Sequence, residues 1–283
     1  MKLKMVLPKG RMYENVNKLL ADAGIHVRGS DRGYRPTSND PDLELKLLKS
    51  QNIPMLVALG QHDCGFAGAD WVAEQNAQVT ELMDLGFDPV SIVACIPETW
   101  DWEDVKRRKI IAASEYRNLC GVFLDEQGVD FTFIRSYGAT EVFPPEDADM
   151  IVDNTATGTT LEANRLKIVA KLMSSTTRLI AHPRALDDVH KRRRIEDLVL
   201  LFRGVLQGRK RVLLEMNCPQ DRLDELVAML PAMRSPTVAK LYSEDSFSVK
   251  VAVERDQVRL LIPKLNRAGA TDILETDILK VMP

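Results

Sequence analysis

The last quarter of the chain carries a pattern of apolar residues that few folds can accommodate. Four apolar runs predict strands, and two stretches with leucine and valine at helical spacing predict helices. The strands are expected at 211–217, 237–242, 247–253 and 272–282, and the helices at 223–230 and 258–265. The order strand-helix-strand-strand-helix-strand is that of the ferredoxin-like fold. We therefore expect residues 208–283 to form a separate C-terminal domain, and Pro263 to kink or shorten its second helix.

The preceding part of the chain alternates strands with helices, which predicts an α/β fold with largely parallel sheets. Strands are expected at 2–7, 54–59, 64–67, 91–96, 109–113, 129–134 and 150–153. Helices are expected at 12–23, 43–49, 116–127, 161–172 and 187–207. The last of these is a long amphipathic helix, which Gly208 is expected to end.

Composition excludes several classes of function. The formal net charge of −3 over 283 residues argues against nucleic-acid binding, and we interpret the basic run 191–194 as a solvated helix face. No apolar run approaches the roughly 20 residues of a membrane helix, and the first eleven residues do not resemble a signal peptide. The four cysteines are far apart and form no CxxC, so reduced thiols in a cytoplasmic protein are expected.

Residues 152–166, VDNTATGTTLEANRL, place small and hydroxylated residues between a predicted strand and a predicted helix. Successive backbone N–H groups in a turn before a helix form a cradle for phosphate, and threonine hydroxyls add donors. Asp153 at the strand end can accept hydrogen bonds from two adjacent ribose hydroxyls. The segment therefore favours a 5-phosphoribosyl group. The alternative is a capping box of Thr159 and Glu162, which needs no ligand but leaves the earlier threonines and the glycine unexplained.

The segment DNTATGTTLEAN (153–164) resembles the phosphoribosyl-diphosphate loop of ATP phosphoribosyltransferases, the first enzyme of histidine biosynthesis. Other segments resemble the long form of this family in the same order, so the resemblance spans nearly the whole chain. They are LPKGR (7–11), IP (53–54), GQHDCGFAGADWVAE (60–74), ASEY (113–116), GATE (138–141), MNCP (216–219) and SPT (235–237).

The resemblance implies a fold and a reaction. The expected fold is a two-lobed, periplasmic-binding-protein-like catalytic core followed by the ferredoxin-like regulatory domain. The first lobe would span 1–95, with the chain returning to it at about 181–207, and the second lobe 96–180. In the implied reaction, N1 of ATP displaces diphosphate from C1 of 5-phosphoribosyl 1-diphosphate. Mg²⁺ would assist mainly from the substrate phosphates, so its protein ligands stay open.

The resemblance also implies three groups of site residues. The phosphoribosyl-diphosphate loop would use Asp153, Thr155, Ala156, Thr157, Gly158, Thr159 and Thr160. ATP and diphosphate would contact Lys9, Gly10, Arg11, Lys49, Gly68, Asp70 and Glu141. Feedback by L-histidine would involve Asn217, Ser235 and Thr237. Family members of this length imply a homo-oligomer, from dimer to hexamer.

Five positions depart from the family's pattern. Lys49 and Asn52 stand where an arginine and an aspartate are usual, so the bidentate fork of arginine is lost. Arg165 follows the loop where glycine is frequent, and Val152 stands where phosphoribosyltransferases on other folds carry a second acid. Asn217 replaces a frequent acid, which is expected to weaken histidine binding.

Three alternatives remain at the level of sequence. A solute-binding protein or sensor on the same two-lobed fold is disfavoured, because neither has a use for a phosphate-cradling loop. A non-catalytic regulatory paralogue is kept open by Lys49 and Asn52. A phosphoribosyltransferase acting on another base is disfavoured by the segment GQHDCGFAGAD.

Overall fold

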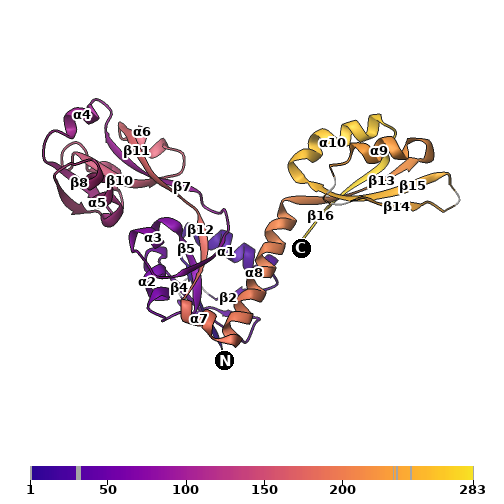
Figure 1. The fold of residues 1–283 in the computed structure, drawn as a ribbon, viewed down its shortest axis with the longest axis horizontal. Coiled ribbons are helices and arrows are strands. Elements are labelled where there is room, and N and C mark those ends of the chain that lie inside the picture. The colour runs from indigo at the N-terminus through magenta and orange to yellow at the C-terminus, as the bar shows by residue number, and fades with distance from the viewer. Residues whose placement is uncertain (1, 30–32, 232, 234, 243, 283) are drawn as a thin grey trace. The chain divides into compact units, whose positions relative to one another are not determined.

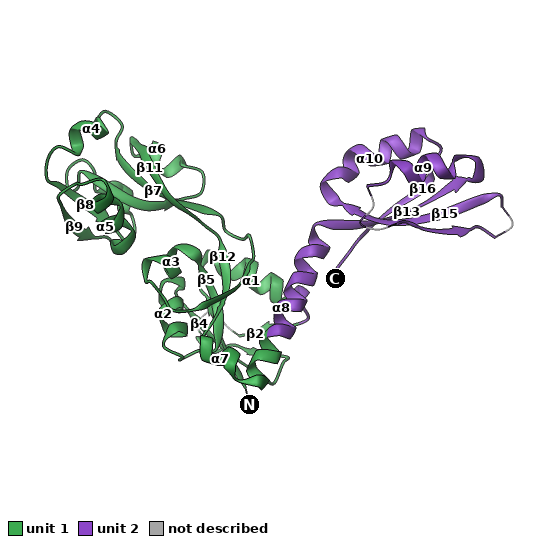
Figure 2. Ribbon diagram, in the orientation of Figure 1, with its two compact units in different colours: residues 1–21, 25–195 green, residues 22–24, 196–283 purple. Residues whose placement is uncertain are grey.

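The computed structural model describes residues 2–29, 33–231, 233, 235–242 and 244–282. The chain divides into two compact units (Figure 2). Unit 1 contains residues 1–21 and 25–195, and unit 2 contains residues 22–24 and 196–283. Within the described residues, no helix combines the length and the apolar character that crossing a membrane requires.

The first lobe of unit 1 is built on a five-stranded sheet with the order β4-β1-β5-β12-β6. Its strands are β1 (Leu3–Pro8), β4 (Leu43–Leu48), β5 (Cys64–Gly68), β6 (Thr80–Asp84) and β12 (Thr177–Ala181). Strands β4, β5 and β12 are labelled in Figure 1. Strand β1 runs parallel to β4 and β5, whereas β12 is antiparallel to both β5 and β6. The lobe also contains α1 (Arg11–Asp22), α2 (Ile53–Ala58), α3 (Ala69–Glu74), α7 (Pro183–Asp187), the turn η1 (Ser50–Asn52) and the short pair β2 (Val27–Arg28) and β3 (Thr37–Ser38).

The second lobe of unit 1 is built on another five-stranded sheet, with the order β11-β7-β10-β8-β9. Its strands are β7 (Val90–Pro97), β8 (Ile110–Ser114), β9 (Phe131–Arg135), β10 (Met150–Thr155) and β11 (Leu166–Ser175). The lobe contains α4 (Trp102–Val105), α5 (Arg117–Glu126), α6 (Thr159–Ala163) and η2 (Thr140–Val142). A core of fully buried Ile92, Ile96 and Met150 holds Tyr116 and α5 against the sheet.

The chain crosses between the two sheets twice, after β6 and after β11. The two crossing segments are bonded to each other. The backbone N–H of Leu85 donates to Thr177 O over 3.0 Å, and that of Thr177 donates to Phe87 O over 2.9 Å. The Thr176 hydroxyl donates to Asp84 Oδ1 over 2.7 Å. We call residues 84–88 and 175–177 the hinge ribbon.

Unit 2 has the predicted ferredoxin-like order. The sheet order is β14-β15-β13-β16, and its strands are β13 (Arg211–Pro219), β14 (Thr237–Lys240), β15 (Ser246–Glu254) and β16 (Thr271–Asp277). The helices are α9 (Leu223–Met229), preceded by η3 (Gln220–Arg222), and α10 (Arg255–Arg267). Alternate residues of β13, such as Val212 and Leu214, are buried in its core. Pro263 lies inside α10, and the helix continues past it to Arg267.

Three predicted elements are wrong. Residues 43–49 were expected to be helical, but β4 occupies 43–48 and buries Leu43, Leu45 and Leu47 on one face, a period of two. Residues 54–59 were expected to be a strand, but they lie mainly in α2, where Pro54 fits the first turn because its missing N–H is not needed there. The expected helix 161–172 is the short α6 followed by the ten-residue strand β11.

Three further expectations also need correction. The sheets of unit 1 are mixed rather than largely parallel, because β12, β7 and β11 pair in antiparallel fashion. Helix α8 (Val189–Arg209) includes Gly208 instead of ending before it. The lobe limits also differ from those expected: β7 starts the second sheet at Val90, β12 returns to the first sheet at Thr177, and unit 2 begins within α8.

Candidate functional site

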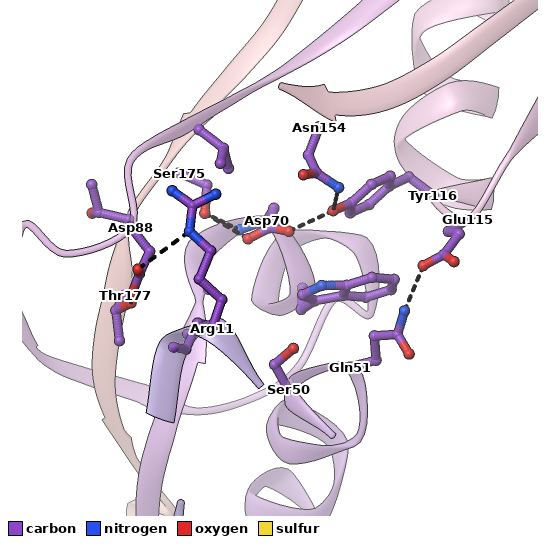
Figure 3. Close-up of a pocket in the computed structure, with 15 residues that line it drawn as sticks. Arg11, Ser50, Gln51, Asp70, Asp88, Glu115, Tyr116, Asn154, Ser175 and Thr177 are labelled. Carbon is purple, nitrogen blue, oxygen red and sulfur yellow. Dashed lines mark hydrogen bonds and ion pairs between the residues drawn. The ribbon is translucent and has the colours of Figure 1, made fainter. Parts of the chain in front are cut away.

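Two cavities in unit 1 share part of their walls. The first, of about 260 Å³, lies at the hinge ribbon and is called the hinge cavity (Figure 3). The second, of about 440 Å³, lies at the segment 153–161 and is called the loop cavity. The hinge cavity is lined by Arg11, Met12, Ser50, Gln51, Gly68, Asp70, Trp71, Asp88, Val90, Glu115, Tyr116, Asn154, Ser175, Thr176 and Thr177. The loop cavity is lined by Arg11, Glu115, Gly138, Ala139, Thr140, Glu141, Asp153, Asn154, Thr155, Ala156, Thr157, Thr159, Thr160 and Leu161.

The loop cavity is formed where β10 ends and α6 begins. Gly158 occupies the first position before α6 with φ +84°, a left-handed conformation that glycine adopts without strain. Its N–H donates to the Thr155 hydroxyl over 2.9 Å, and the hydroxyls of Thr157 and Thr159 are 2.8 Å apart. The N-cap residue of α6 is Gly158, which has no side chain, so Thr159 lies inside the helix and not at the capping position that the alternative required. The loop instead places hydroxylated side chains around a cavity.

Asp153 is the mostly buried carboxylate of the loop cavity. The backbone N–H of Asn154 donates to its Oδ1 over 2.7 Å. Burial raises the pKa of Asp153 to about 6; the carboxylates of Glu141 and Glu115 also raise it, against hydrogen bonds from Asn154 and Thr140. An ionised Asp153 is therefore costly without a ligand. Donors that enter the cavity, such as ribose hydroxyls, would relieve that cost.

A buried hydrogen-bond network closes one side of the hinge cavity. Asp70, only 5% exposed, accepts from the Ser175 hydroxyl over 2.5 Å and from the Tyr116 hydroxyl over 2.8 Å. Tyr116 stacks on Trp71, with ring centroids 4.7 Å apart. Asp70 and Trp71 belong to the first lobe, Tyr116 to the second and Ser175 to the hinge ribbon, so the network joins all three parts of the site (Figure 3).

The lobes are bonded a second time near this network. Glu74, at the end of α3, accepts from the backbone N–H groups of Asn118 and Leu119, each over 3.0 Å. These N–H groups lie in the first turn of α5, where helical partners are missing, so Glu74 acts as a cap from the other lobe. Gln51 of η1 donates to the carboxylate of Glu115 over 2.5 Å.

The predicted cations do not all reach the cavities. Arg11 begins α1 and lines both of them, with its Nε 3.9 Å from Asp88 Oδ1. Gly10 precedes it with φ +78°. The ammonium group of Lys9 lies 3.7 Å from the centre of the Tyr34 ring, and Lys49 is exposed before η1. Within the described residues that line the two cavities, neither lysine appears.

Comparison with known sequences identifies the family. The profile of the family described as HisG, ATP phosphoribosyltransferase, matches residues 49–204, and that of the HisG C-terminal domain matches residues 208–280. An ATP phosphoribosyltransferase of Pelotomaculum thermopropionicum is 40% identical over 100% of both chains. One from Thermodesulfovibrio yellowstonii is 38% identical over 99% of this chain and 98% of the relative. The chain belongs to the ATP phosphoribosyltransferase family.

A solved structure supports the fold of this ATP phosphoribosyltransferase family member. The chain is similar to the ATP phosphoribosyl transferase (HisG:HisZ) complex from Thermotoga maritima, with a TM-score of 0.64 and 22% sequence identity. The match covers 71% of this chain and 98% of the chain in that structure. At this identity the likeness concerns the fold alone, which agrees with the two-lobed core expected from the sequence.

The residues predicted for histidine binding lie in unit 2 and are not gathered in one place. Asn217 on β13 donates to Asp272 Oδ2 over 3.0 Å. Thr237 begins β14, and β15 lies between these two strands. Ser235 is exposed in the segment before β14. Asn217 pairs with Ser248 and Thr237 pairs with Lys250, so two strand spacings and a two-residue offset place them about 12 Å apart in one chain.

Sequence reasoning missed several residues of the hinge cavity. Trp71 and Tyr116 lie inside segments that resemble the family but were not assigned a role, and Gln51 stands beside the noted departures at 49 and 52. Asp88 and Ser175 belong to the hinge ribbon, which was not recognised as a unit. The polar run SSTT at 174–177, which interrupts an apolar stretch, is the sequence signal that could have marked it.

Proposed function

We propose that the two cavities of unit 1 bind the two substrates of the family's reaction side by side. The 5-phosphoribosyl group would occupy the loop cavity, and the adenine of ATP would occupy the hinge cavity. The carrying observation is the shared wall: Arg11, Glu115 and Asn154 line both cavities, so ligands filling them come into contact there. N1 of adenine would then attack C1 of the sugar at this wall.

The walls suit the groups assigned to them. The loop cavity offers threonine hydroxyls and the N-terminal turn of α6 to the 5-phosphate, and Asp153 to the ribose hydroxyls. The hinge cavity offers apolar surface from Met12, Trp71 and Val90, which suits a purine ring.

The chemistry requires positioning and charge rather than a nucleophilic side chain. The lone pair of adenine N1 forms the new bond to C1, while the C1–O bonding pair leaves with diphosphate. The sugar carbon becomes cation-like between these events, and the nearby carboxylates of Asp153 and Glu141 would stabilise that charge. Arg11 would neutralise the departing diphosphate from the shared wall.

We propose Mg²⁺ as the cofactor, carried on the diphosphate of the substrate. Within the described residues, no group of three or more His, Cys, Asp or Glu side chains could hold a metal alone. Glu115 and Glu141 nevertheless offer carboxylate oxygens on the cavity wall, which are the ligands that magnesium prefers beside phosphate oxygens. The metal would supply positive charge for the leaving group.

Regulation and assembly are part of the same proposal. Unit 2 would bind L-histidine and inhibit the reaction, with Asn217, Ser235 and Thr237 as candidate contacts. A homo-oligomer, from dimer to hexamer, in the cytoplasm fits the family's long form. The four free cysteines are all buried, which is compatible with a reducing compartment.

An ultraviolet assay tests the proposal. The protein is mixed with ATP, 5-phosphoribosyl 1-diphosphate, Mg²⁺ and a pyrophosphatase, and the absorbance of N1-substituted adenine is followed with and without histidine. A rise that histidine suppresses supports both the reaction and the regulatory role. A rise indifferent to histidine keeps the reaction and makes unit 2 an assembly domain. Binding of both substrates without any rise would overturn the proposal in favour of a non-catalytic paralogue.

A further inference from the structure

Asn154 lies between the two cavities and contacts a residue on either side. It follows Asp153 on β10, pairs with Ile92 of β7 and is exposed on the shared wall. Its Nδ2 is 3.2 Å from Asp153 Oδ1. The same Nδ2 is 3.2 Å from the Tyr116 hydroxyl, and Figure 3 draws this second contact. An amide NH₂ carries two N–H donors, which matches these two acceptors.

The Tyr116 end of this bridge is fixed. Tyr116 is 1% exposed, stacks on Trp71 and donates its hydroxyl proton to Asp70. Burial and the Asp70 carboxylate raise the pKa of Tyr116, so its hydroxyl stays protonated. Because that proton points to Asp70, the hydroxyl oxygen presents only lone pairs to Asn154. The amide of Asn154 must therefore turn its NH₂ group, not its oxygen, toward Tyr116.

The Asp153 end of the bridge is thereby fixed as well. The side-chain amide and the backbone N–H of Asn154 both donate to Oδ1 of Asp153. Two donors on one oxygen hold the carboxylate in one rotamer and favour its ionised form. A carboxylate prepared in this way receives ribose hydroxyls without first reorganising.

We propose that Asn154 is a positioning residue that holds the Asp153 carboxylate ready for the ribose hydroxyls, with the Tyr116 hydroxyl as its anchor. This inference rests on the proposed function, since it assumes that the loop cavity takes 5-phosphoribosyl 1-diphosphate. The bridge also ties the loop cavity to the Asp70 network, which spans both lobes and the hinge ribbon. A purely structural role does not explain the contacts, because the exposed side chain of Asn154 fills no core.

The test measures binding of 5-phosphoribosyl 1-diphosphate with Mg²⁺ by calorimetry from pH 5 to 8.5. Asn154→Ala removes both side-chain donors, and Asn154→Asp keeps the shape but sets a carboxylate against Asp153. The expected order of affinity is wild type, Asn154→Ala, Asn154→Asp, with a loss of about tenfold at the first step. Asn266→Ala is the matched control, because Asn266 is also exposed and donates to the backbone oxygen of Ala270 in unit 2.

The pH profile separates positioning from general weakening. In wild type, affinity falls as Asp153 is protonated, and loss of the Asn154 donor should move that fall to higher pH. Glu141 and Glu115 also raise the pKa of this carboxylate, and Arg11 lines the same cavity. All three are unchanged in every variant, so the displacement reports Asn154. Asp153→Asn should keep only the loss of affinity at low pH that comes from protonation of the substrate phosphates, and Asn266→Ala should keep the profile of wild type.

The outcomes divide clearly. This inference alone is overturned if wild type and Asn154→Ala bind with the same affinity and lose that affinity over the same pH range. Wild-type protein that binds no 5-phosphoribosyl 1-diphosphate at any pH overturns the proposed function, and this inference with it. The positioning role is supported if Asn154→Ala binds more weakly, loses affinity at a higher pH than wild type, and unfolds at the same temperature as wild type.

Discussion

Asp153 should make the free protein less stable because it serves a ligand. Burial raises the pKa of Asp153 from its ordinary 3.8 to about 6, so the folded lobe binds a proton roughly a hundredfold more tightly than the unfolded chain. Each tenfold corresponds to about 1.4 kcal/mol, so ionised Asp153 destabilises the fold by about 3 kcal/mol. Below about pH 4, Asp153 is protonated in both the folded and the unfolded state and does not destabilise the fold. As pH rises, the unfolded chain loses this proton first, so stability falls until the pH has passed through 6, the pKa of the folded state.

The perturbation is Asp153→Asn, which removes the charge and keeps the shape. At pH 8 the free energy of unfolding should increase by up to about 3 kcal/mol over wild type, and the gain should vanish near pH 4. The same variant should bind 5-phosphoribosyl 1-diphosphate at least about a hundredfold more weakly, because two hydrogen bonds to a charged group are lost. Stability and binding should thus change in opposite directions.

Urea unfolding followed by tryptophan fluorescence is the assay. The three tryptophans, Trp71, Trp100 and Trp102, all lie in unit 1, so the signal reports the catalytic core and not unit 2. Asp125→Asn is the matched control, because Asp125 is an exposed aspartate of α5 and should change stability by less than about 0.5 kcal/mol. A gain that is the same at pH 4 and pH 8, or no gain at either, would refute the reasoning.

Three other predictions concern separate parts of the chain. Arg165 follows α6 with φ +54°, so Arg165→Gly should raise stability by up to about 1 kcal/mol, whereas Arg165→Val should lower it in chemical denaturation. Glu74→Ala removes the cap of α5 and should cost about 2 kcal/mol by the same fluorescence assay, whereas the exposed Glu126→Ala on that helix should cost little; equal effects would contradict the capping role. A chain ending at Arg209, which retains all of α8, should lose inhibition by histidine in initial-rate measurements; inhibition that persists would place the effector site in unit 1.

Local patterns predicted the C-terminal unit well. The two central strands β13 and β15 alternate buried residues with more exposed ones, each helix is bounded by clear turn residues, and neighbours in sequence mostly pack together. The core was harder because two leucine-rich segments fit both periods. LELKLLK at 43–49 matches a helical face as well as an alternating strand, and pairing with β1 along its full length decides in favour of the strand. Residues 161–172 were expected to form one helix. Pairing with β7, which local sequence does not reveal, makes residues 166–172 part of strand β11 instead.

The candidate site shows the same division between local and distant information. The loop at 153–160 could be predicted because consecutive residues build it, and the structure places its side chains around one cavity, apart from Gly158, which shapes the turn. The bridge from Asp70 through Tyr116 to Asn154 joins residues 46 and 38 positions apart. Only the assembled lobes bring these residues together, and no spacing in the sequence indicates it.

The hinge ribbon has a mechanical consequence. Two neighbouring extended segments that are bonded edge to edge bend more easily across their plane than within it. The ribbon would therefore favour one direction of lobe motion once the other bonds between the lobes, from Glu74, Gln51 and Tyr116, are broken. Asp88, Ser175, Thr176 and Thr177 belong to the ribbon and also line the hinge cavity. A molecule in that cavity therefore touches the element whose curvature sets the angle between the lobes. Ligand binding in the hinge cavity and the angle between the lobes are then thermodynamically linked. A ligand that binds one curvature of the ribbon more tightly increases the population of that curvature.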